Sequence, residues 1–199
     1  TATRDPNVMA ATAGARGALW RLLPGQRSRT SILRVGLAVL DRMERVGSLR
    51  VPDPESDLVL DTGITDRKTI RTALRQLHAH GIGTLHTDTL AAGARRAHTS
   101  FEFSVPPSTG PEIPPPGSHT PLPPALWHVL PPAAAIFWHY LRTSSLPVSP
   151  AALLSGTGQT APGTVASRHQ LGNAVDVLRQ LGRIGLATCD EHGAWRAAT

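Results

Sequence analysis

The feature that most constrains the fold is a proline-rich stretch in the middle of the chain. Residues 106–124 (PPSTGPEIPPPGSHTPLPP) contain nine of the 18 prolines in a chain of 199 residues. Such a stretch favours extended polyproline II over helix or sheet, because proline fixes φ and lacks an N–H donor. We therefore predict a linker at residues 106–124. It joins a domain at residues 28–105 to a second domain at residues 125–199, and residues 1–27 form a separate segment.

The composition excludes several classes of protein. With 40% hydrophobic and 17% charged residues, the chain differs from intrinsically disordered sequences. No apolar stretch approaches the ~18 residues that a membrane span needs. The start has neither an initiator Met nor a signal peptide, so we expect a soluble piece of a longer protein. Cys189 is the only cysteine, which excludes an internal disulfide and favours the cytoplasm.

Positive charge is concentrated at the N-terminal end of the chain. The formal net charge is +6, from 20 basic and 14 acidic residues. Residues 1–50 hold nine arginines against three acidic residues, whereas residues 106–199 hold five against four. Residues 1–27 spread four arginines among small residues, and we interpret them as a linker or as a basic arm that follows a DNA backbone. The N-terminal half is therefore expected to bind an acidic partner.

Residues 28–105 show a helix, a short helix, a turn, a helix and a hairpin in that order. The first helix has an apolar stripe at helical spacing, formed by Ile32, Val35, Val39, Met43 and Val46. A third helix is expected to run to His80, with Thr65 or Asp66 as its N-cap and Gly81 ending it. Two alternating runs follow, GTLHTDTL and TSFEFSV, around the tip AAGARRAH, and they predict a β-hairpin.

The segment from Asp61 to Ile82 resembles the turn and recognition helix of winged-helix DNA-binding proteins. The resemblance covers residues 28–105 and rests on the glycine-containing turn, the leucine-rich helix and the Gly-Ile pair before the hairpin. It implies that the third helix enters the major groove of double-stranded DNA and that the hairpin is the wing.

A helical wheel over residues 65–80 places polar and basic side chains opposite the apolar face. The predicted DNA-binding residues on this outer face are Arg67, Lys68, Arg71, Thr72 and Arg75. Arg95 and Arg96 at the hairpin tip are predicted to contact phosphate or a minor groove. The alternatives are an ordinary solvated helix face and two solvated loop arginines.

The second half repeats this plan. Arg-Gln-Leu at residues 75–77 and Gly-Ile at 81–82 recur 104 residues later as Arg-Gln-Leu and Gly-Leu. A helix over residues 165–183 and a hairpin with its tip at residues 190–193 are expected. The chain is thus predicted to be mainly α-helical with small β-hairpin wings. It forms two winged-helix domains in tandem, similar to plasmid-type replication initiators and some transcription regulators.

The two copies are not expected to perform the same role. The second hairpin tip is acidic, and the outward face of helix 165–183 mixes Asp176 with the possible second-domain DNA contacts, Arg168, Arg179 and Arg183. The segment AAAIFWHYLR is apolar nearly all round, which indicates burial against a partner chain or against the other domain. Phe137, Trp138 and Tyr140 are predicted to anchor a homodimer. The alternative is that a tryptophan packs within the chain, under residues 121–130.

No motif indicates catalysis or a cofactor. The sequence lacks a Walker-type loop, a dinucleotide fingerprint and paired carboxylates at helical spacing. His78 with His80, or Cys189 with His192, supplies too few ligands for a zinc site, so we expect neither a metal nor a small-molecule substrate. The sequence therefore predicts a non-enzymatic protein that binds double-stranded DNA in replication or transcription. The alternative is a protein-interaction module that does not bind DNA.

Overall fold

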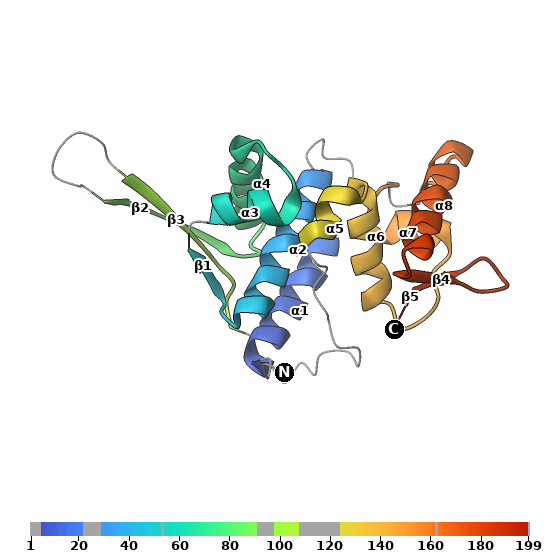
Figure 1. Ribbon diagram of the computed structural model, residues 1–199, viewed down its shortest axis with the longest axis horizontal. Coiled ribbons are helices and arrows are strands. Elements are labelled where there is room, and N and C mark those ends of the chain that lie inside the picture. Colours follow the sequence, from blue (N-terminus) through green and yellow to red (C-terminus); the bar gives the residue numbers. More distant parts are fainter. Residues whose placement is uncertain are drawn as a thin grey trace.

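The computed structural model describes residues 5–21, 29–52, 54–90, 98–107, 124–161 and 163–198, with the backbone alone for residues 88–90, 98–101, 124 and 127. Its elements, in chain order, are α1 (Pro6–Trp20), α2 (Arg29–Val46), β1 (Arg50–Pro52), α3 (Pro54–Thr62), α4 (Arg67–Ala79), β2 (Thr84–Leu90), β3 (His98–Ser104), α5 (Pro124–Val129), α6 (Pro132–Thr143), α7 (Pro150–Gly156), α8 (Arg168–Arg183), β4 (Ala187–Cys189) and β5 (Trp195–Ala197). The chain is mainly helical with small antiparallel sheets, as the sequence predicts (Figure 1). Most of the predicted linker, residues 108–123, lies outside the described residues. Within the described ranges, no helix has the length and apolarity to cross a membrane.

The same order of elements occurs on both sides of residues 108–123. In the N-terminal half, α2 is followed by β1, α3, α4 and the hairpin β2–β3. In the C-terminal half, α6 is followed by Val148, α7, α8 and the hairpin β4–β5. Strand β1 pairs with β3 through Val51 and Phe103, and Val148 forms the corresponding isolated bridge with Trp195 of β5. The two halves therefore share strand pairing as well as element order.

Hydrogen bonds at equivalent turns also match. Thr62 and Thr157 are fully buried, and the hydroxyl of each donates to the carbonyl four residues earlier, at 2.5 and 2.8 Å. The residue after the C-cap is a glycine in both helices, Gly81 (φ +71°) after α4 and Gly185 (φ +75°) after α8. Glycine adopts this left-handed conformation without a Cβ clash. In both helices the N–H after the glycine donates back to a leucine carbonyl, at 3.0 and 2.9 Å.

Helix α1 contradicts the prediction of an arm or linker over residues 1–27. The Asp5 side chain caps its N-terminus, and the helix packs along α2 (Figure 1). Leu19 is fully buried and lies against Gly36 of α2, where an added Cβ would be 2.7 Å from it. The prediction was wrong for residues 6–20 because small side chains pack closely without producing a strong amphipathic stripe.

Helix α6 lies between α2 of the N-terminal half and α7 and α8 of the C-terminal half (Figure 1). Phe137 and Trp138 are only 1% and 3% exposed, and the Tyr140 ring lies 5.6 Å from that of Trp20 in α1. Phe137 and Trp138 are therefore buried within the chain and are not exposed, which agrees with the alternative of burial against the other domain, whereas Tyr140 is half-buried. The predicted homodimer stays a prediction. The helix is apolar nearly all round because it contacts neighbours within the chain on opposite sides.

A buried network of charged side chains joins α1, α2 and α6. Arg16 donates to Asp41 at 2.7 Å and to Glu44 at 2.5 Å, and the Thr12 hydroxyl donates to Glu44 at 2.6 Å. His139 Nε2 lies 3.2 Å from the other oxygen of Asp41. Burial alone would raise the pKa of Asp41, but His139 and Arg16 outweigh burial and lower that pKa to about 2. The network therefore links the N-terminal helix to both halves of the fold.

Candidate nucleic-acid interface

Helix α4 begins and ends where the sequence predicts. The Asp66 carboxylate accepts from the backbone N–H groups of Lys68 and Thr69, at 3.0 and 3.2 Å, and from the Thr69 hydroxyl at 2.6 Å. These hydrogen bonds, led by that of the Thr69 hydroxyl, lower the pKa of Asp66. The inner face buries four residues, Ile70, Ala73, Leu74 and Leu77. Asp66 thus acts as the N-cap, and the apolar side holds the helix against the core.

The outer face of α4 presents four of the predicted DNA-binding residues to solvent, namely Arg67, Lys68, Thr72 and Arg75. No acidic residue occurs in the helix itself. Beside its N-terminal half is a hollow of about 370 Å³, lined by Ser31, Ile32, Asp66, Lys68, Thr69, Thr72 and Ala73. The structure therefore provides an exposed cationic helix face next to a shallow depression.

Arg71 differs from the other predicted residues on this helix. Its Nε and Nη2 donate to the two carboxylate oxygens of Glu55 in α3, at 2.5 and 2.8 Å. The Glu55 side chain is only 6% exposed, and its hydrogen bond raises the pKa of Arg71. This geometry ties α3 to α4 through Arg71, whose side chain is 40% exposed. Its predicted contact with DNA stays a prediction.

The hairpin β2–β3 extends from the side of the molecule that carries α3 and α4 (Figure 1). Its strands are antiparallel over the full length of both, from Thr84 opposite Ser104 to Leu90 opposite His98. Arg95 and Arg96 lie outside the described residues, so their predicted contact with DNA stays a prediction. The described strands place the base of the hairpin directly after α4.

The corresponding helix in the C-terminal half has mixed charge. Arg168, Arg179 and Arg183 are exposed. Arg179 forms an ion pair with Asp176 on the same face, at 3.2 Å. A carboxylate at this position repels phosphate, so the outer face of α8 is less suited to an anionic partner than that of α4.

The second hairpin tip is acidic in the structure as well. Asp190 accepts from the backbone N–H groups of His192 and Ala194, at 2.9 and 2.8 Å, so its carboxylate stabilises the turn. Glu191 beside it is exposed. This tip is therefore unsuited to an anionic partner.

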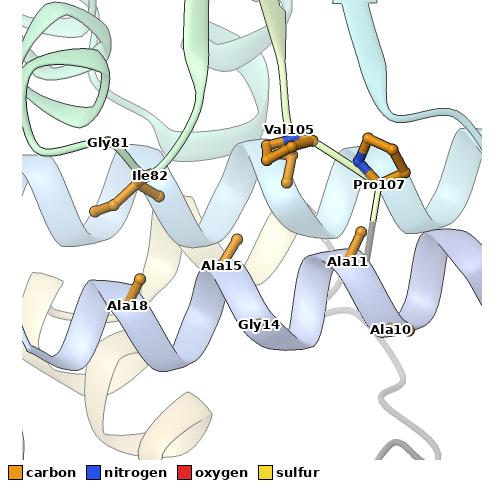
Figure 2. A pocket seen from close by; sticks show the side chains of 10 residues that line it. Ala10, Ala11, Gly14, Ala15, Ala18, Gly81, Ile82, Val105 and Pro107 are labelled. Carbon is orange, nitrogen blue, oxygen red and sulfur yellow. The ribbon is translucent and has the colours of Figure 1, made fainter. Parts of the chain in front are cut away.

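A groove of about 260 Å³ lies between α1 and the segments that hold Ile82 and Val105 (Figure 2), and no residue of the outer face of α4 lines it. Its lining includes the small side chains of Ala11, Ala15 and Ala18 in α1, together with Ile82 and Val105. It contains no charged side chain. Since no charged side chain lines it, the groove is not part of the candidate interface.

Two residues of structural importance carry no signal in the sequence. Glu55 is separated from Arg71 by 16 residues, and Arg16 is separated from Asp41 by 25. Neither pair has helical or strand spacing, so only the packing of α3 on α4 and of α1 on α2 brings the partners together. Within the described part of the chain, no group of three His, Cys, Asp or Glu residues is placed to hold a metal ion.

Comparison with protein-family models, curated proteins and solved structures gave no match. The function is therefore inferred from the geometry of the chain itself.

Proposed function

We propose that this protein binds double-stranded DNA through a winged-helix domain formed by residues 29–105, with α4 as the recognition helix. The observation that carries the proposal is the exposed basic face of α4, which follows α3 and precedes the hairpin β2–β3. A recognition helix occupies this place in winged-helix domains. The repeat of the same order in the C-terminal half supports a tandem arrangement of two such domains.

In this proposal the N-terminal half of α4 enters the major groove. Lys68 and Thr72 reach base edges or adjacent phosphates, and Arg67 and Arg75 contact the backbone on either side. Arg71 holds α3 and α4 at a fixed angle through Glu55. The hairpin follows the flanking backbone as a wing, with Arg95 and Arg96 as its contacts.

The C-terminal half has a supporting role in this proposal. Its hairpin tip is acidic and its helix α8 carries Asp176 among three arginines. Arg168 and Arg183 are the second-domain residues best suited to a weak phosphate contact. If the DNA sequences bound by the protein cluster at a replication origin, they would indicate a replication initiator. If they lie at promoters, they would indicate a transcription regulator.

The test replaces Lys68, Thr72 and Arg75 together by alanine. All three side chains are exposed, so the variant should fold normally, as checked by its circular dichroism and thermal midpoint. We expect duplex affinity to fall by about 1–3 kcal/mol for each side chain that reads a base, and preference among sequences to relax. The matched control removes two exposed arginines elsewhere, Arg21 and Arg196. Equal binding by the triple variant and the control would rule out α4 as the DNA-binding helix.

A further inference from the structure

Arg29, the first residue of α2, forms a hydrogen bond to the C-terminal half. The Arg29 residue is 6% exposed, and its Nη1 donates to the carbonyl of Thr157 at the C-cap of α7. A cation is favourable at this end of a helix. The guanidinium also occupies the space over Gly158, where an added Cβ would collide with it.

A second polar contact between the halves lies further along α2. Asp41 is 12 residues after Arg29, or about 18 Å along a helix, and it pairs with His139 of α6. Because the two contacts are separated along one helix, α6 and α7 are restrained from both sliding and rotating against α2.

The remaining contacts approach from other directions. Trp20 at the end of α1 meets Tyr140 of α6 edge to face, and His128 of α5 contacts the carbonyl of Leu60 in α3. Buried apolar residues of both halves belong to one continuous cluster, which extends from Leu19 in α1 to α8. Helices α1, α2 and α3 therefore all contact the C-terminal half.

We propose that the two halves form one rigid unit, in which the contacts of α5, α6 and α7 with α1, α2 and α3 fix the position of α8 relative to α4. The segment 108–123 then serves as a covalent tether and does not set the spacing. Arg29 and His139 are positioning residues in this arrangement. As applied to DNA, the inference rests on the proposed function and predicts that α8 is held at one fixed position relative to a duplex bound by α4.

The direct test uses the full chain with a protease site inserted in residues 108–123. After cleavage, the two halves should elute together in size-exclusion chromatography, with the mass of the intact chain by light scattering at low micromolar concentration. Elution as two smaller species would overturn the proposal. In the cleaved protein, Arg29→Ala should weaken association of the halves by about tenfold or more, because the substitution removes a buried hydrogen bond from a charged donor. Arg196→Ala, which removes an exposed arginine, should leave the association unchanged.

A second experiment lengthens the tether of the uncut protein by about ten Gly and Ser residues, which behave as a flexible coil. A rigid unit should keep its duplex affinity within about twofold and should protect the same length of DNA. Protection that changes with tether length would show that the segment sets the spacing and would contradict the inference. If the uncut protein binds no duplex, the proposed function fails, while the cleavage experiment still decides whether the halves form one unit.

Discussion

Replacing Arg16 by methionine should destabilise the protein far more than removal of a surface arginine. The Arg16 side chain is 2% exposed, and its partners Asp41 and Glu44 are 1% and 0% exposed. Methionine keeps much of the apolar volume but leaves Glu44 with only the Thr12 hydroxyl among its described partners. Removal of one partner from a buried ion pair costs about 3–5 kcal/mol. That cost is a large part of the roughly 5–15 kcal/mol by which a domain is typically stable.

The assay is urea denaturation followed by far-ultraviolet circular dichroism near neutral pH. Arg42→Met is the matched control, because Arg42 is 25% exposed and its two partners tolerate its loss. Asp61 keeps a second ion pair with Arg45 at 2.7 Å, and the Asp57 side chain is 38% exposed. We expect this control to lower the free energy of unfolding by about 1 kcal/mol or less. Adding Glu44→Gln to the Arg16 variant should recover part of the stability, since it removes the uncompensated carboxylate.

The result that refutes this reasoning is an Arg16→Met variant that is destabilised by less than about 1 kcal/mol, or by no more than Arg42→Met. Either result would mean that the hydrogen bonds and ion pairs of Arg16 stabilise the fold no more than the apolar packing of a methionine at the same position. The docking of α1 would then depend on its apolar contacts alone.

The remaining predictions also concern stability. Gly36→Ala should lower the thermal midpoint of the protein, since the new Cβ would lie 2.7 Å from Leu19. Gly172→Ala on α8 should raise the thermal midpoint, because the new Cβ meets open space and alanine is favoured over glycine in a helix by about 0.5–1 kcal/mol. The pKa of Asp41 is lowered from 3.8 to about 2. The ionised carboxylate therefore adds on the order of 2 kcal/mol to the free energy of unfolding above pH 3.8, and this stabilisation is lost as the pH falls toward 2. Unfolding curves across this range should show that decline, and Asp41→Asn should lack it. Asp66→Ala should lower the urea midpoint because it removes the side-chain cap of α4, and an unchanged midpoint would contradict that role.

Elements defined by local signals could be predicted from the sequence. Asp66 and Gly81 delimit α4 because an N-cap carboxylate and a left-handed glycine act within a few residues of themselves. The hairpin β2–β3 follows from alternating apolar residues around a small-residue tip. The repeat after 104 residues likewise led to the correct order of elements in the second half.

Features that depend on contacts between distant segments could not be predicted. Arg71 looked identical to its neighbours on the outer face, yet Glu55 of α3 binds it. The apolar character of α6 indicated two neighbours, but the sequence left open whether Phe137 and Trp138 lie against a partner chain or against the other half, and only the packing of α2 on α6 decides between them. Strand β1 could not be predicted from the sequence either, because it has only three residues and depends on pairing with β3, which lies far along the chain.

The most direct test of the central claim is the affinity of the whole chain for duplex DNA across a series of salt concentrations, measured by fluorescence anisotropy. Each phosphate contact contributes about 0.9 to the slope of log K against log salt. The three exposed cations of α4, Arg67, Lys68 and Arg75, therefore predict a slope of about −3 or steeper. Absence of binding at low salt, or binding that does not change with salt, would contradict DNA recognition by this face.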